Sequence, residues 1–322
     1  MPAEVKEKIQ HAPQRGKSKG KWRIVDAIMV IDRHVPNRVR HLKWLMVIPA
    51  ILVISALAFG LVDLGVKAFS PHDPYGDNET VGLTLENFKR LFAGPTSDYY
   101  RGVFLRTFGM AILTAVTATF VGGCVAYLIV RARRAWVRGL GVLLALVPFL
   151  MGEIVRAFGW LMLLGRDGFV AWGAEQLNLP FPQFIGTLGG VWIGLMQVMA
   201  PIAAFVMIPA IRAVHPDLER AAATLGASPR KTWRHVSLPL LRPGLVSSFV
   251  VVFALTMAQF AIPDVLGAGT TPFVANVIEN IFFVRGNAHL AGAAAMVMLA
   301  FVILAITILL GFGSARKRSN RG

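Results

Sequence analysis

Long apolar runs without charged residues recur along the chain, and six of them are long enough to cross a lipid bilayer. About 20 helical residues, rising about 1.5 Å each, cover a hydrocarbon core about 30 Å thick. Lipid offers the backbone amides no hydrogen-bond partner, so these runs must be helical. The predicted spans are residues 44–62, 107–130, 139–163, 188–211, 245–262 and 290–312. This pattern predicts an all-α, polytopic membrane protein with six transmembrane helices.

The basic residues gather in the segments at one end of these spans. With the N-terminus placed inside, the inner segments hold 25 of the 33 Lys and Arg residues and 6 of the 17 acidic residues. These inner segments are residues 1–43, 131–138, 212–242 and 313–322. Because cytoplasmic loops are enriched in Lys and Arg, the placement predicts that both termini are cytoplasmic. The expected organisation is a basic tail over 1–43, a membrane domain over 44–312 and a second basic tail over 313–322.

Composition supports this class and excludes several others. The chain has 322 residues, of which 55% are hydrophobic and 16% charged, where a soluble domain has about a quarter charged. The net charge of +16 lies mostly beside the predicted helix ends, where it meets anionic lipid headgroups, so we expect no nucleic-acid partner. The single cysteine, Cys124, excludes a disulfide framework and a cysteine-based metal site. Within the N-terminal tail, residues 23–32 are expected to form a short interfacial helix.

No motif for covalent chemistry is present. Gly16-Lys17-Ser18 resembles the end of a phosphate-binding loop, but His11 occupies the required upstream glycine position and no strand precedes it. The chain also has no His-Glu-x-x-His sequence and no Ser/Lys or paired-aspartate arrangement inside a span, which argues against an intramembrane enzyme. We therefore expect no catalytic residue, cofactor or metal in this chain.

The inner loop over residues 212–242 has the composition of two short helices. Pro216 suits a first helical turn, the alanines that follow favour helix propagation, and Gly226 suits the left-handed position after the last turn. Ser228-Pro229 then signals a second helix, which Pro239 and Pro243 are expected to end before the fifth span. An alanine-rich pair of helices lets another protein approach the backbone closely. We therefore predict a docking surface, and we name residues 212–242 the coupling loop.

The coupling loop resembles that of binding-protein-dependent ABC importer permeases. Their pattern is Glu-Ala-Ala, three residues, Gly, nine residues, Ile, one residue and Leu-Pro. At this spacing the chain carries Arg220, Ala221, Ala222, Gly226, Val236, Leu238 and Pro239. Val236 is a conservative change, whereas Arg220 stands where the family has glutamate. Glu219 precedes it by one residue, about 100° around a helix, and so cannot simply take its place.

The resemblance implies a type I ABC importer permease fold and a transport subunit without enzymatic activity. It implies a second permease, with which the chain would form a heterodimer, and a periplasmic or lipid-anchored substrate-binding protein. It also implies a cytoplasmic ATPase dimer, holding ATP and Mg, that would contact the eight residues 219–222, 226, 236, 238 and 239. The expected location is the bacterial inner membrane.

Within this superfamily the chain is most similar to the polyamine-type permeases. The similarity lies in Val155 to Trp160, in Ile262 to Gly267 and in Val274 to Ile278, and it covers roughly residues 100–312. It implies import of spermidine or putrescine. Permeases for ferric iron, sulfate and thiamine are near relatives and stay as alternatives. A secondary transporter is a weaker alternative, because no internal repeat between the two halves is evident and the coupling loop would be unexplained.

Ionisable and aromatic residues near the outer ends of spans three and five are candidates for the substrate path. Charged side chains at membrane depth usually face a cavity or one another. Glu153 and Arg156 lie three residues apart on one predicted helical face, either as an ion pair or along the path. A polycation would need carboxylates and aromatic faces. The candidates are Glu153, Arg156, Trp160, Phe260 and Asp264.

Overall fold

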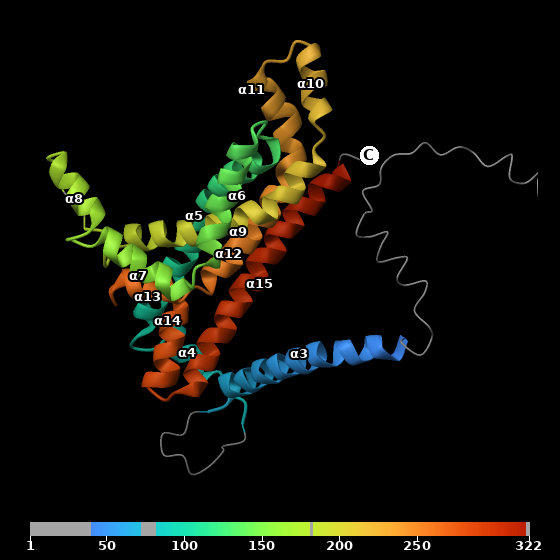
Figure 1. Ribbon diagram of the computed structural model, residues 1–322. Coiled ribbons are helices and arrows are strands. Elements are labelled where there is room, and N and C mark those ends of the chain that lie inside the picture. The colour runs from blue at the N-terminus through green and yellow to red at the C-terminus, as the bar shows by residue number, and fades with distance from the viewer. Residues whose placement is uncertain (1–39, 72–81, 181–182, 320–322) are drawn as a thin grey trace, which may run out of the picture. The chain divides into compact units, whose positions relative to one another are not determined.

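The computed structural model describes the backbone of residues 40–71, 82–180 and 183–319. The predicted helix at 23–32 and most of the tail over 1–43 lie outside these ranges. Every regular element of the described residues is helical (Figure 1). The chain divides into two units, residues 1–61 and 62–322. The described part of the first unit is the beginning of helix α3 (Arg40–Phe69).

The second unit contains the rest of the helices. In chain order they are α4 (Glu86–Phe92), α5 (Ser97–Arg131), α6 (Ala135–Leu150), α7 (Glu153–Leu164), α8 (Phe169–Gln176), α9 (Leu188–Ala213), α10 (Pro216–Thr224), α11 (Pro229–Thr232), the π-helix η2 (Trp233–Ser237), α12 (Leu238–Met257), α13 (Ala261–Gly267), α14 (Val274–Glu279), the π-helix η3 (Asn280–Val284) and α15 (Ala288–Ser319).

Five stretches of described helix are long and apolar enough to cross a membrane, and a bent pair makes a sixth if it counts as one span. The five are Val47–Phe69, Ser97–Arg131, Leu188–Ala213, Pro229–Met257 and Ala288–Leu309. Each overlaps one of the predicted spans, and the bent pair overlaps the third. An all-α polytopic membrane protein is therefore confirmed.

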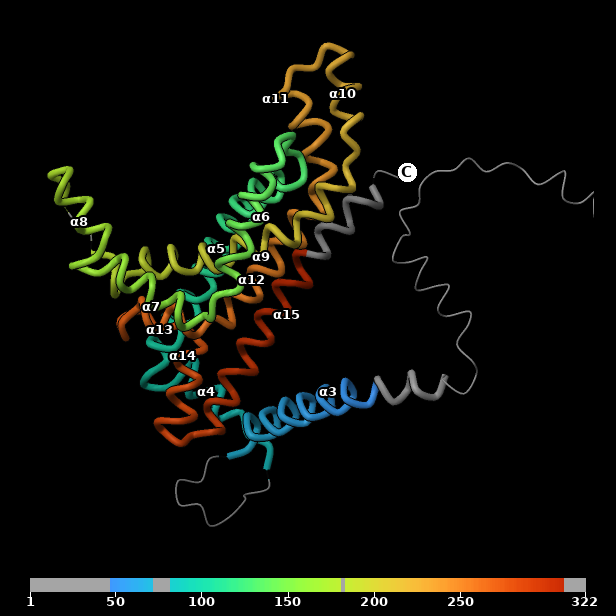
Figure 2. The backbone as a smooth tube through the Cα atoms, in the orientation of Figure 1, coloured from blue at the N-terminus to red at the C-terminus, as the bar shows by residue number. Residues whose placement is uncertain are grey.

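The prediction of one continuous third span over 139–163 was wrong. The chain bends by 105° between α6 and the segment of α7 and α8, as the tube in Figure 2 shows. Pro148 removes a backbone donor near the end of α6, and Met151 and Gly152 are extended, with ψ of 138° and 144°. Hydropathy alone continues across these two residues, so the pattern of apolar positions hides the break.

The fifth predicted span also differs from the helix that occupies it. The span was placed at 245–262, whereas α12 ends at Met257 and a separate helix, α13, begins at Ala261. Between them the amide of Gln259 bonds to the carbonyl of Thr256, which closes a turn rather than continuing the helix. Residues 258–267 therefore form a separate short segment that follows α12, and its helix α13 packs against α7 and α9.

The core of the second unit forms where α5, α9 and α12 pack against one another. Small residues permit the close approach: a Cβ built on Gly122 of α5 lies 2.5 Å from the carbonyl oxygen of Ala200 in α9. Buried hydroxyls join the same helices, with the oxygens of Thr119 and Ser248 3.3 Å apart. These contacts hold α5, α9 and α12 together. The coupling loop connects the end of α9 to the start of α12.

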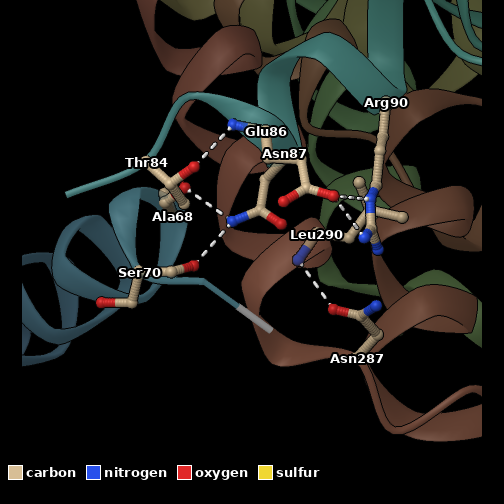
Figure 3. A network of polar contacts seen from close by, with 8 residues as sticks. All are labelled: Ala68, Ser70, Thr84, Glu86, Asn87, Arg90, Asn287 and Leu290. Carbon is tan, nitrogen blue, oxygen red and sulfur yellow. Dashed lines mark hydrogen bonds and ion pairs between the residues drawn. The ribbon is translucent and has the colours of Figure 1, made fainter. Parts of the chain in front are cut away.

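The last turns of α3 belong to the second unit and are held there by Asn87 of α4 (Figure 3). Its side-chain amide donates to the carbonyls of Ala68 at 3.0 Å and Ser70 at 2.9 Å, and the residue is 2% exposed. Helix ends leave carbonyl groups without partners, and this amide satisfies two of them.

Candidate functional site: the coupling loop and a polar segment between α7 and α13

The first helix of the coupling loop has the termini that its sequence predicted. Pro216 occupies the first turn of α10, and the ring of His215 accepts a hydrogen bond from the amide of Asp217. At the other end Gly226 has φ +81°. Its amide bonds to the carbonyl of Ala223, and that of Ala227 bonds to Ala222, which is the Schellman arrangement of a left-handed glycine cap. The prediction that Gly226 is the left-handed residue after the last turn of this helix is therefore confirmed.

The second helix does not end at the prolines, which corrects the sequence prediction. The chain stays helical from Pro229 to Met257, through α11, η2 and α12. In η2 the amide of Leu238 bonds five residues back to Trp233, and the wider π turn places Pro239 in the first turn of α12. Pro243 lies inside α12 without ending it. The coupling loop is therefore joined to the fifth span by continuous helix.

Glu219 points into the loop rather than away from it. Its carboxylate accepts a hydrogen bond from the Ser237 hydroxyl at 3.0 Å and lies 3.9 Å from the Arg131 guanidinium, at the end of α5. Arg131 in turn donates to the carbonyl of Val214 at 2.6 Å. One carboxylate thus connects α10, η2 and α5. Sequence reasoning missed Arg131 and Ser237, which lie far from Glu219 along the chain and carry no local signal.

Arg220 points outward. Its side chain is 78% exposed and its guanidinium lies 3.0 Å from the carboxylate of Asp217, whereas the Glu219 side chain is 27% exposed. The sequence predicted that Arg220 and Glu219 lie about 100° apart around the helix. In agreement, the Arg220 side chain faces outward and the Glu219 side chain faces the loop. Ala221 and Gly226 are also exposed. The remaining motif positions are partly buried, namely Ala222, Val236, Leu238 and Pro239.

The structure does not pair Glu153 with Arg156. The carboxylate of Glu153 accepts a hydrogen bond from the side-chain amide of Gln259, which follows α12. Arg156 donates to the carbonyl of Pro148 at 2.7 Å, so it satisfies a group that the break after α6 leaves without a helical partner. Because α6 and α7 are separate helices, Glu153 and Arg156 do not continue the helix of α6.

The other path candidates lie on α7, on α13 or immediately before α13. Helix α7 packs against α13, and the two share the apolar core of the unit. The indole of Trp160 donates to the side-chain oxygen of Gln197 in α9 at 3.3 Å. Phe260, immediately before α13, and Asp264 within it are both exposed. We name α7, residues 258–260 and α13 the polar segment. Gln259 belongs to it although the sequence pattern gave no reason to choose it.

Within the part of the chain that the structure describes, no group of three or more His, Cys, Asp or Glu side chains is placed to hold a metal ion. What the geometry offers is an exposed helical pair joined to the fifth span and a group of polar side chains beside the core. Neither is an arrangement for covalent chemistry.

The chain belongs to the family of binding-protein-dependent transport system inner membrane components, whose model matches residues 118–316. It is therefore a multi-pass permease subunit of an ABC importer in the inner membrane, and a transport subunit rather than an enzyme. The matched range contains the coupling loop and the polar segment.

Three permeases of known name are similar to this chain. The inner membrane ABC transporter permease protein YdcU of Escherichia coli K12 is 27% identical over 84% of this chain and 90% of its own length. The spermidine/putrescine transport system permease protein PotB of Salmonella typhimurium SL1344 is 26% identical over 69% of this chain and 76% of its own. The ferric transport system permease protein FbpB of Actinobacillus pleuropneumoniae is 31% identical, over 46% of this chain and 21% of its own.

The fold is that of solved ABC importers. A crystal structure of a bacterial alginate ABC transporter with its substrate-bound periplasmic protein contains a chain that aligns with a TM-score of 0.66. The alignment covers 85% of this chain and 94% of that one, at 14% identity. This similarity confirms the permease fold that the motif implied.

Proposed function

We propose that the coupling loop is the cytoplasmic contact between this permease and an ATPase dimer that holds ATP and Mg. Support comes from the excess of Lys and Arg in the segments on the same side as the loop, from the capped helical pair, and from the exposed small residues at Ala221 and Gly226. In this orientation both termini are cytoplasmic. The observation that carries the proposal is the helical pair itself, in which Gly226 caps the first helix and Glu219 joins that helix to η2 and to the end of α5.

Motion at the coupling loop would reach the membrane domain along two connections. One is the continuous helix from Pro229 to Met257, which passes from the loop into the core. The other is Glu219, through which α10 is joined to the end of α5 at Arg131. When the ATPases close and open, differential contacts with the loop would shift the permease between outward-facing and inward-facing states.

We propose a polyamine as the solute. Two exposed carboxylates, Glu153 and Asp264, lie on the packed pair α7 and α13, and the aromatic rings of Trp160 and Phe260 lie on the same segment. Carboxylates and aromatic faces are the groups that recognise organic ammonium ions. The similarity to a spermidine/putrescine permease supports the same class. Arg156, held against Pro148, would then have a structural role rather than contact the solute.

Ferric iron is the second candidate, because a ferric permease matches about as well over a shorter range. Sulfate and thiamine stay as weaker alternatives from the motif resemblance. Membership of a binding-protein-dependent family argues against an ATP-independent secondary transporter. The complete importer would contain a second permease, forming a heterodimer with this chain, and a periplasmic or lipid-anchored binding protein.

Two measurements test this proposal. The orientation is tested with Ala227→Cys in a Cys124→Ser background, treated with a membrane-impermeant maleimide. Labelling in inverted vesicles but not in intact cells supports a cytoplasmic loop. Labelling in intact cells contradicts it. For the solute, proteoliposomes holding the complete importer are given labelled spermidine, ferric ion, sulfate or thiamine, with and without internal ATP. ATP-dependent uptake of spermidine supports the proposal. If only another of these solutes is taken up, the proposal of a polyamine is wrong and that solute takes its place.

A further inference from the structure

The tip of the coupling loop carries an excess of exposed positive charge. Between Val214 and Ser237 the exposed ionic side chains are Arg220, Arg230, Lys231, Arg234 and Asp217. The other acidic residue of this stretch, Glu219, points inward to Ser237 and Arg131. Asp217 is the one acidic group left on the surface of this stretch, and Arg220 already lies beside it.

Three of these cations have no anionic partner among the described residues. No carboxylate of the described chain lies within ion-pair distance of Arg230, Lys231 or Arg234. Exposed ion pairs such as Arg220 with Asp217 contribute little to stability, so Arg220 can also meet an anion of another molecule. The surface is therefore available for an anionic partner.

Helix length separates this surface from the lipid headgroups. The helix from Leu238 to Met257 has 20 residues, of which only Arg242 is charged, and these cover about 30 Å of hydrocarbon. At about 1.5 Å per residue, Lys231 and Arg230 lie about 10 and 12 Å beyond it, whereas the headgroup layer adds only about 5–8 Å on each side. Figure 1 shows α10 and α11 side by side beyond the ends of α9 and α12. Arg234 lies at headgroup depth by the same arithmetic.

Apolar side chains stand among these charges. Leu225, before the cap, is 88% exposed, and Leu218 and Trp233 are about half exposed. An apolar centre with a charged rim is the usual composition of a protein–protein interface. Together with the distance from the membrane, it favours a protein partner over a lipid surface.

We propose that the coupling loop docks into an acidic groove of the ATPase, with Arg220, Arg230 and Lys231 opposite carboxylates of that subunit. This inference rests on the proposed docking function and adds the charge of the partner. Where the resemblance places glutamate, this chain presents Arg220 outward, so the partner must carry the opposite charge from the one that a glutamate would meet. The charges would mainly set partner choice and the association rate.

The test measures association of the ATPase with nanodiscs that contain this full-length chain and the second permease. In zwitterionic lipid, raising salt from about 50 to about 300 mM weakens association, because exposed charge pairs are screened. Arg220→Glu and the double variant Arg230→Glu/Lys231→Glu each weaken it about tenfold at low salt and flatten the salt dependence. Arg133→Glu, an exposed arginine outside the loop, is the matched control and changes association less than about twofold. A lysine in place of an acidic groove residue of the ATPase restores binding to Arg220→Glu.

The outcomes separate this inference from the one beneath it. If the ATPase binds the wild type equally well at low and high salt, and binds the charge-reversal variants as well as the wild type, the proposal of an acidic groove is wrong. ATPase docking itself would still stand. Sensitivity to charge reversal that appears only in anionic nanodiscs overturns the acidic groove in favour of lipid headgroups. Absence of any ATPase association with the assembled wild-type permease, at every salt concentration, overturns the docking function itself.

Discussion

The Ser237 hydroxyl donates to the Glu219 carboxylate at 3.0 Å, and this contact closes the coupling loop onto the start of the fifth span. Ser237 is almost completely buried, and Glu219 also faces Arg131 at 3.9 Å. The family glutamate position is thus taken by an outward arginine, while the neighbouring glutamate has become an internal connection. In this permease that carboxylate joins α10 to η2 and to the end of α5, and it acts beside the continuous helix from Pro229 to Met257.

Replacing Glu219 is expected to uncouple ATP hydrolysis from transport. Glu219→Ala leaves the buried hydroxyl of Ser237 without its acceptor, at a cost of about 1–3 kcal/mol for an unsatisfied group, and it removes the carboxylate that faces the mostly buried Arg131. Uptake per ATP hydrolysed should fall severalfold in proteoliposomes while the ATPase stays bound. Asp217→Ala, which removes an exposed carboxylate of the same helix, is the control and should change this ratio little. An unchanged ratio in Glu219→Ala would show that the connection carries no motion.

Gly122 is expected to be intolerant of any side chain. A Cβ there would lie 2.5 Å from the Ala200 carbonyl and 2.6 Å from the Cβ of Ala203, so α5 and α9 would have to separate. Such overpacking costs about 1–3 kcal/mol, and Gly122→Ala should lower the melting temperature of the purified protein by several degrees.

The adjacent glycine supplies the control for this effect. A Cβ on Gly123 has its nearest neighbour, the Cε of Met207, at 3.9 Å, which is an ordinary contact. Gly123→Ala should therefore melt close to the wild type. Equal melting temperatures for the two variants would contradict the close approach of α5 and α9.

Asn87 is expected to stabilise the attachment of the α3 end to α4. Asn87→Asp keeps the shape but cannot donate to the carbonyls of Ala68 and Ser70, and it places a charge in a site that is 2% exposed. Limited proteolysis of the detergent-purified protein should cut the segment between α3 and α4 faster in this variant. Lys89→Ala, at an exposed position of the same helix, should be cut at the wild-type rate, and the same rate in Asn87→Asp would remove the proposed role.

The carboxylates of the polar segment should affect solute uptake without affecting assembly. Asp264→Asn and Glu153→Gln remove charges that we assign to the recognition of an organic cation, and each should lower spermidine uptake by about tenfold at limiting concentration. Asp167→Asn, an exposed carboxylate outside the polar segment, is the control. Wild-type uptake by Asp264→Asn would take this residue out of the solute path.

The sequence predicted those features that depend on neighbouring residues. Apolar runs predicted the helices, and Pro216 with Gly226 predicted both ends of α10, because caps are set by local backbone geometry. The break after α6 was missed because hydropathy is blind to the two extended residues Met151 and Gly152. Helix through Pro239 was missed because a π turn, which no local pattern announces, accommodates that proline.

The contacts within the candidate sites were beyond prediction for a different reason. Glu153 meets Gln259 across 106 positions of the chain, and Glu219 meets Arg131 at the end of a helix two spans earlier. Such pairs arise from the packing of α7, α12 and α13, and of α5 against the loop, which a single sequence does not specify. The spacing of Glu153 and Arg156 fits an ion pair on one helix, yet Arg156 bonds to the carbonyl that the break after α6 leaves free and Glu153 bonds to the side chain of Gln259.

The central claim is that an ATPase drives this permease through the coupling loop, and Gly226 tests it most directly. A Cβ at Gly226 meets nothing within 4 Å, so a larger side chain would project outward rather than disturb the chain. At φ +81° Asn is tolerated better than other residues, so Gly226→Asn controls for backbone strain. In proteoliposomes with the complete importer, Gly226→Trp is expected to abolish ATP-driven uptake while Gly226→Asn retains most of it. Wild-type uptake by Gly226→Trp, at equal insertion, would contradict the account.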